Sequence, residues 1–283
     1  MKLILITAVV LLIKTEVEAV CHCNDQKFIV SIQKNSADGK GPQHICGAAI
    51  IDKFHVITAA HCVYGLGNGA QLRIRTDQRD AETNSASGGT MNTITYYDVA
   101  ELMCHPSYDD SNGSSHLNDI AILKVNGGFD LDKSDAYMKV DLPNSKTEID
   151  YSTALYSGFL VKNFSDHSVG VNNHSRGFDD ANDYVYQDTR VWPLEWYEKI
   201  TPKVTDAHIV TNFETDIGVE WIGNDGGPLV FHKHHYNQTG YYTTTNTIIG
   251  IRIEPKLYSK ETLALFTRVS SHLQFIEKVL SAY

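Results

Sequence analysis

Three short segments of the chain carry side chains that could act together in chemistry: TAAHC with His61, LNDIAIL with Asp119 and GNDGGP with Asp225. An imidazole whose second nitrogen is held by a carboxylate is a general base, and it can activate a hydroxyl for attack on a carbonyl carbon. The third segment offers a carboxylate in place of a hydroxyl. A carboxylate is a poor nucleophile toward an amide, and we expect it to pair with His61 and keep the imidazole protonated. A protonated imidazole cannot act as a base, so these residues predict a site without catalysis.

The order of the three segments resembles the chymotrypsin/trypsin family of serine proteases, in which a serine stands at the position of Asp225. Further segments match the family in order along the chain: Cys46–Ile51, Val56–Thr58, Ser157–Phe159, Phe266–Ser270 and Phe275–Ile276. The resemblance implies an all-β fold of two six-stranded antiparallel β-barrels with a C-terminal helix. The stretch from Gln43 to Val63 is most similar to the mite group 3 trypsin-like allergens and to the inactivated serine protease paralogues of scabies mites.

The same resemblance shows where the chain departs from an active protease. The family's aspartate before the serine pairs with a newly cut amino terminus and shapes the oxyanion hole, and here that position is Asn224. No Ile-Val-Gly-Gly activation sequence stands between Ala19 and Cys46. An alternative alignment takes Asp225 as the activating aspartate and the serine as deleted, with the same chemical consequence.

The substrate pocket is also expected to be occluded. By the resemblance, its residues are Val219, Trp221, Ile253, Glu254 and Pro255. The indole of Trp221 would fill the primary specificity pocket. Pro255 has no N–H, so the strand that normally pairs with the substrate backbone would lose a donor.

The amino terminus predicts a signal peptide. Lys2 precedes an apolar run from Leu3 to Ile13, and cleavage is expected after Ala19. The run is too short to span a bilayer. We therefore expect residues 1–19 to be removed and residues 20–283 to be a secreted domain. A net charge of −10 argues against nucleic acid or an anionic membrane as a partner.

Apolar and β-branched runs between turn signals predict the strands of both barrels. The first barrel, about 20–126, has runs at 28–33, 47–58, 71–76, 93–103 and 120–125. The second, about 145–269, has runs at 153–161, 203–212, 228–232, 247–253 and 262–269. A linker is expected at 127–143, a long surface loop at 162–182 and a closing helix at about 271–281.

Five cysteines in a secreted chain predict oxidised pairs with one cysteine left over. By the family resemblance, Cys46 and Cys62 form a disulfide that fixes the turn carrying the histidine. The pairing among Cys21, Cys23 and Cys104 stays open.

No metal site is predicted. The CHC segment at residues 21–23 has no second cluster of ligands, and the histidines around Lys233 are expected to form a solvated hairpin tip. Exposed loops are expected at the glycosylation sequons, whose asparagines are Asn112, Asn163, Asn173 and Asn237.

A stable secreted scaffold without a working nucleophile predicts a binding protein that needs no cofactor. The scabies mite paralogues that the chain resembles are secreted into the gut and faeces, where they bind host complement components and inhibit complement. Host complement proteins are therefore the expected partners. The alternatives are a weakly active or atypical serine-type hydrolase, and a decoy for protease inhibitors or substrates.

Overall fold

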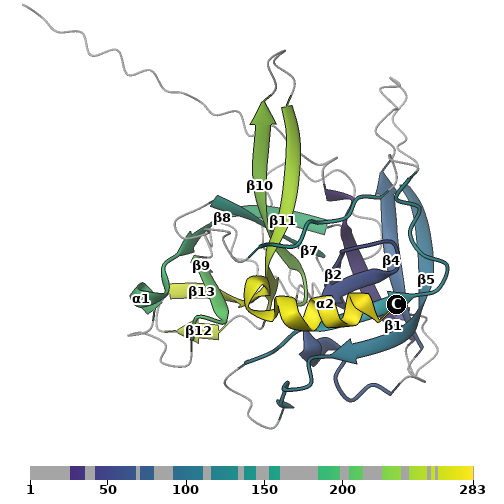
Figure 1. The fold of residues 1–283 in the computed structure, drawn as a ribbon, viewed down its shortest axis with the longest axis horizontal. Coiled ribbons are helices and arrows are strands. Elements are labelled where there is room, and N and C mark those ends of the chain that lie inside the picture. Colours follow the sequence, from purple (N-terminus) through teal and green to yellow (C-terminus); the bar gives the residue numbers. More distant parts are fainter. Residues whose placement is uncertain are drawn as a thin grey trace, which may run out of the picture.

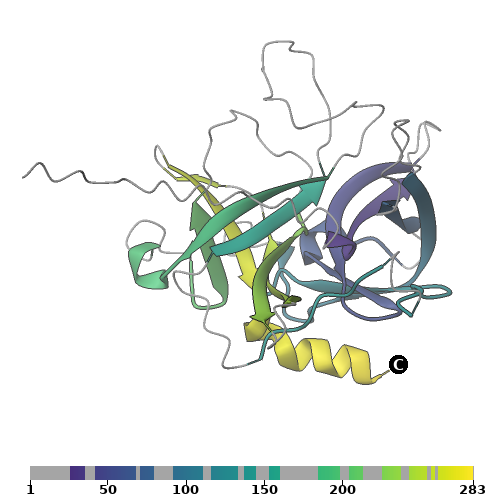
Figure 2. The same ribbon diagram turned by 90° about the horizontal axis from the view of Figure 1, so that it is seen from above.

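The computed structural model describes residues 26–35, 42–67, 71–79, 92–110, 116–132, 137–144, 153–159, 184–197, 204–212, 225–236, 242–253, 256–258 and 261–282. They form two β-barrels that lie side by side, with a helix along one side of their junction (Figures 1 and 2). This arrangement confirms the fold class expected from the sequence. No helix in these ranges is long and apolar enough to cross a membrane.

The first barrel is closed by six antiparallel strands in the order β1-β2-β3-β6-β5-β4. Their bounds are β1 Ile29–Asn35, β2 Pro42–Ile50, β3 His55–Thr58, β4 Leu72–Arg79, β5 Asn92–Cys104 and β6 Ala121–Val125. Strand β4 alternates as a half-exposed strand of a barrel does, since Leu72 and Ile74 are buried and their outward neighbours are not. Strand β1 is instead buried over five consecutive residues and β3 throughout.

The second barrel is a ring of six strands in the order β11-β10-β7-β8-β9-β13, closed by pairing between β11 and β13. Their bounds are β7 Thr153–Phe159, β8 Tyr184–Trp192, β9 His208–Asn212, β10 Pro228–Tyr236, β11 Tyr242–Arg252 and β13 Glu261–Arg268. Among the described strands, the short strand β12 Lys256–Tyr258 pairs with β13 alone, and a four-residue helix, α1 Leu194–Tyr197, follows β8.

The sequence did not predict strand β8. Its carboxyl half alternates between exposed and buried residues, but Thr189, a polar residue, takes one of the buried positions. The expected run at 47–58 is a hairpin, because β2 ends at Ile50 and β3 begins at His55.

The two barrels share a continuous apolar core at their junction. Strand residues of both barrels, such as Ile57 and Ile251, belong to one buried cluster. Helix α2 Leu273–Ser281 adds Ile276 and Val279 to the same cluster. The amphipathic helix thus seals the junction from one side, and the candidate site lies where β3 and β6 of one barrel face β10 and β11 of the other.

Candidate active site

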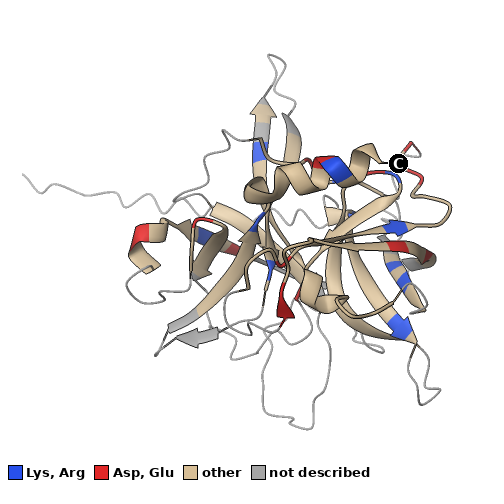
Figure 3. Ribbon diagram, turned by 60° about the horizontal axis from the view of Figure 1, so that its bottom comes forward, with Lys and Arg blue, Asp and Glu red and all other residues tan. Residues whose placement is uncertain are grey.

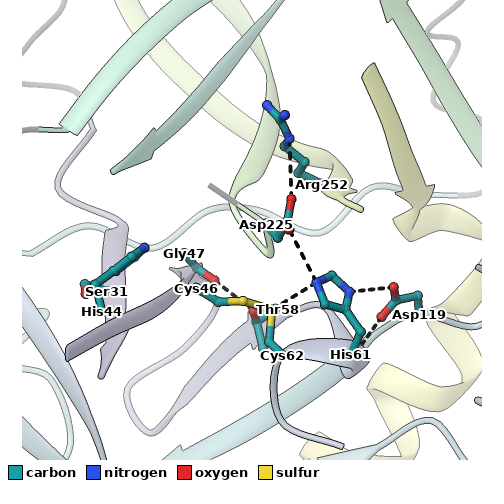
Figure 4. The surroundings of a disulfide bond; sticks show 10 residues. All are labelled: Ser31, His44, Cys46, Gly47, Thr58, His61, Cys62, Asp119, Asp225 and Arg252. Carbon is teal, nitrogen blue, oxygen red and sulfur yellow. Dashed lines mark hydrogen bonds and ion pairs between the residues drawn. A yellow bond between two sulfur atoms is a disulfide. The ribbon is translucent and has the colours of Figure 1, made fainter. Parts of the chain in front are cut away.

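His61 is fixed by its own turn and by a disulfide. It follows β3 in a single 3-10 turn, Ala60–Cys62, and the disulfide between Cys46 and Cys62 ties that turn to β2. The imidazole Nδ1 lies 2.7 Å from Asp119 Oδ2, and the main-chain N–H of His61 donates to Asp119 Oδ1 at 2.8 Å. The base and its orienting carboxylate are therefore brought together, and Figure 4 shows them in line.

Asp119 is completely buried and is held from both barrels. The preceding residue, Asn118, has φ 57°, a left-handed conformation that asparagine tolerates and that turns the chain sharply before β6. From the second barrel, Thr267 Oγ1 donates to the Asp119 carbonyl at 2.9 Å. The position of this carboxylate is thus set by main-chain geometry as well as by His61.

Asp225 lies opposite His61, in the loop that precedes β10. Its Oδ2 lies 3.7 Å from His61 Nε2, and its carbonyl accepts a 2.8 Å hydrogen bond from the Gly47 N–H of the first barrel. The next residue, Gly226, has φ 78°, and a Cβ there would collide with Thr58 Oγ1 and the Gly47 carbonyl oxygen. Only glycine allows this close approach of the loop to β2.

Arg252 is a site residue that the sequence did not single out. It ends β11, is only 1% exposed, and places Nε 3.7 Å from Asp225 Oδ1. Its guanidinium carbon lies 5.1 Å from the centre of the Tyr156 ring. The signal that could have found it is a lone cation inside the apolar run IIGIRI at residues 248–253.

The carboxylates control the charge of His61. Burial alone would lower the pKa of His61, but the hydrogen bonds and negative charges of Asp119 and Asp225 outweigh burial and raise the pKa from 6.5 to about 10. The imidazole is therefore an imidazolium at neutral pH. In this form neither ring nitrogen can accept a proton, and the ring lies as a cation between two carboxylates.

Burial also raises the pKa of two other groups, the Cys104 thiol and the Tyr156 hydroxyl. Desolvation, with a smaller contribution from the negative charge of Asp119, raises the pKa of the Cys104 thiol to about 11. Desolvation raises the pKa of Tyr156 to about 12, although the charge and hydrogen bond of Arg252 act in the opposite direction. Cys104 is a free, half-buried thiol, and both groups are neutral at physiological pH.

No hydroxyl takes the place of the missing nucleophile within the described part of the chain. His61 Nε2 lies 3.7 Å from Asp225 Oδ2 and 3.6 Å from Cys62 Sγ. The sulfur atoms of Cys46 and Cys62 lie close enough to His61 to suggest a metal site. They are bonded to each other, however, so they offer no thiolates to a metal ion.

Charged residues are otherwise spread over the molecule. Figure 3 shows basic residues on several strands of the first barrel with acidic residues among them, and both colours appear again near the centre of the view. The charged residues of the described part of the chain are thus distributed over several elements.

Several predicted residues lie outside the described residues. These are Asn224, Val219, Trp221, Glu254, Pro255, the sequon residues Asn112, Asn163, Asn173 and Asn237, and the cysteines Cys21 and Cys23. The expected surface loop at 162–182 also lies outside them. Of the predicted pocket residues, Ile253 is described: it is fully buried, and its N–H donates to the Leu265 carbonyl at 2.9 Å.

The comparison with protein families gives one match, the trypsin family, over residues 18–276. The chain belongs to the trypsin family. A venom serine protease of Polistes dominula is 26% identical over 243 residues, which cover 83% of this chain and 76% of that protein. Melanization protease 1 of Drosophila melanogaster is 26% identical over 257 residues, covering 84% of this chain and 59% of that protein. Trypsin-1 of Astacus astacus is 35% identical over 88 residues, 30% of this chain and 33% of that protein.

Within this trypsin-family fold, the site keeps the histidine and the aspartate of a serine protease and presents a second carboxylate toward the histidine. Such an arrangement can hold a positive charge very firmly. In an active member of the family, a hydroxyl and an unprotonated imidazole meet at this place.

Proposed function

We propose that the chain is a catalytically inactive, secreted member of the trypsin family that acts as a binding protein. The observation that supports inactivity most strongly is the position of Asp225. It stands where the family has its serine, and its Oδ2 lies 3.7 Å from His61 Nε2. Loss of the nucleophile alone costs on the order of 10⁶ in turnover in subtilisin. Here the general base is also protonated, which adds a second barrier to the same reaction.

The proposal that the protein is secreted rests on its amino terminus and on its relatives. Residues 1–19 have the charge and apolar run of a signal peptide. The Cys46–Cys62 disulfide suits an oxidising compartment. Two of the relatives found are named as venom proteases, from Polistes dominula and Apis mellifera, and venom proteins leave the cell that makes them.

The proposed partners are host complement components, and the proposed effect is inhibition of complement. This step rests on the similarity of the stretch from Gln43 to Val63 to the inactivated paralogues of scabies mites. A standard protein interface needs about 800 Å² on each partner, which the rigid outer surface of two barrels can supply. Exposed apolar residues such as Tyr96 and Trp196 lie on that surface, one on each barrel.

The test is complement-mediated lysis in the presence of the purified mature protein. We expect the wild type to inhibit lysis, and we expect a cleft variant, His61→Gln with Asp225→Asn, to inhibit equally well once circular dichroism shows that it is folded. Matched surface variants, Tyr96→Ser and Trp196→Ser, identify which barrel carries the binding face. A wild type that does not affect lysis would refute the choice of partner. A folded cleft variant that alone loses inhibition would place binding in the cleft and refute the surface model.

A further inference from the structure

Four charged side chains form a row where the two barrels meet, and Figure 4 shows them joined by dashed lines. We call it the charge row, and its members in order are Asp119, His61, Asp225 and Arg252. The three contacts measure 2.7 Å, 3.7 Å and 3.7 Å, and the charges alternate in sign along the row. Two carboxylates face two cations, so the row is neutral as a unit when the imidazole is protonated.

The charge row crosses the junction between the barrels. Its first two members belong to the first barrel, where His61 follows β3 and Asp119 precedes β6. Its last two belong to the second barrel, where Asp225 precedes β10 and Arg252 ends β11. The contact between His61 Nε2 and Asp225 Oδ2 is therefore an ion pair between barrels.

Main-chain hydrogen bonds hold the row in place from both sides. The Gly47 N–H of β2 donates to the Asp225 carbonyl at 2.8 Å, which crosses the junction beside the ion pair. Within the second barrel, the Gly226 N–H donates to the Arg252 carbonyl at 2.8 Å, and the Arg252 N–H donates to the Gly227 carbonyl at 2.9 Å. The loop that carries Asp225 is thus fastened to β11 at the arginine itself and to β2 opposite.

The two residues at the ends of the charge row are buried, so each needs the opposite charge of its neighbour in the row. Asp119 is fully buried and the Arg252 side chain is 2% exposed, whereas His61 and Asp225 are 27% and 30% exposed. A buried charge that loses its partner is strongly destabilising, while removal of both partners together is often tolerated. Each end of the row therefore depends on the carboxylate or imidazolium next to it.

We propose that the charge row is a structural clamp between the two barrels, in which Arg252 supplies the counter-charge that makes Asp225 tolerable at the position of the family's serine. The clamp gives His61 and Asp119 a role that needs no catalysis. It would hold whether or not the protein binds complement, so the two proposals can fail separately.

A double-mutant cycle on the full mature chain tests the clamp. The variants are Asp225→Asn, Arg252→Met and the double variant, with equilibrium unfolding in urea as the measurement. We expect each single variant to lower the folding equilibrium constant at least tenfold, and we expect the double variant to lose at least tenfold less than the product of the two. The matched control is the partly exposed pair of Glu101 and Lys124, 3.5 Å apart within the first barrel, where the coupling should be a few-fold at most.

A second cycle, His61→Gln with Asp225→Asn, measures the coupling that crosses the junction. Because Asp225→Asn could prevent folding, a measurement on the wild type accompanies it: nitrogen-15 NMR of the His61 ring at pH 8. Both ring nitrogens should be protonated. A neutral ring at pH 8, or cycles in which the single losses simply multiply, would overturn the clamp.

Discussion

Raising the pH from 7 to 9 should destabilise the protein, because His61 is held as a cation in the folded state. Its pKa rises from 6.5 to about 10 on folding, through the two carboxylates that face it. The folded protein therefore binds a proton that the unfolded chain has already released in this range. Stability from this proton is fully present below pH 6.5 and is lost as the pH rises toward 10.

The size of the effect follows from the two pKa values. A rise from 6.5 to about 10 contributes about 5 kcal/mol of stability at low pH. Between pH 7 and pH 9 the free energy of unfolding should fall by about 2.5 kcal/mol from this group alone. Two other groups contribute little in this range: the pKa of Cys104 rises from 9.0 to about 11, and burial lowers the pKa of His272 from 6.5. The loss from Cys104 reaches only about 0.4 kcal/mol by pH 9, and the effect of His272 falls mostly below pH 7.

The assay is urea unfolding of the wild type and of Asp225→Asn at pH 7, 8 and 9. The slope of the free energy against urea should stay constant, since the surface exposed on unfolding does not change. In the variant one of the two carboxylates that raise the pKa of His61 is gone, so we expect less than half of the wild-type loss. The difference between the two proteins isolates His61 from every other titrating group. A wild type whose free energy of unfolding varies by less than about 0.5 kcal/mol across this range would refute the reasoning.

Three further predictions concern the same site. Asp225→Ser should restore no hydrolysis of peptide or ester substrates, because the restored hydroxyl would still face an oxyanion loop that lacks its ion pair at Asn224; efficient hydrolysis by this variant would show that the loop is already preorganised. The same variant should lower the urea midpoint, because the buried arginine loses its carboxylate. Gly226→Ala should cost at least about 2 kcal/mol, because its Cβ would collide with β2 at a φ of 78°, whereas Gly65→Ala, at φ 73° with open space around it, should cost about 1 kcal/mol. Equal losses in thermal unfolding would show that the collision is relieved. Replacing the disulfide by Cys46→Ala with Cys62→Ala should cost about 3 kcal/mol, since it closes a loop with a sequence separation of 16, and an unchanged melting temperature would contradict this.

Much of the fold follows from the sequence because apolar and β-branched runs mark the strands and turn residues separate them. These runs predicted the strands of the first barrel, from β1 to β6. The number of strands in each barrel was expected from the resemblance to a known family. Strand β8 was missed because Thr189, one of its two described buried positions, is polar, so the apolar pattern is broken there. The four-residue helix α1 is too short to show any helical period.

The site was predictable in its first three members and not in its fourth. His61, Asp119 and Asp225 stand in recognisable motifs, so their meeting could be expected before the structure was known. Arg252 stands in a strand, where a charged residue is expected to face solvent. Its burial depends on the carboxylate that the tertiary fold places beside it. Two unusual residues, an acid in the nucleophile loop and a base in an apolar strand, are complementary changes that only the folded chain brings together.

The central claim is that this trypsin-family chain has no peptidase activity, and the most direct test is chemical. The purified mature protein would be incubated with a broad panel of peptide and ester substrates and with a serine-reactive phosphonate, beside an active trypsin as the positive control. We predict no turnover above the uncatalysed rate and no covalent labelling, because Asp225 occupies the place of the nucleophile and His61 is protonated. Stoichiometric labelling of any residue in the cleft, with turnover that the label abolishes, would contradict the account.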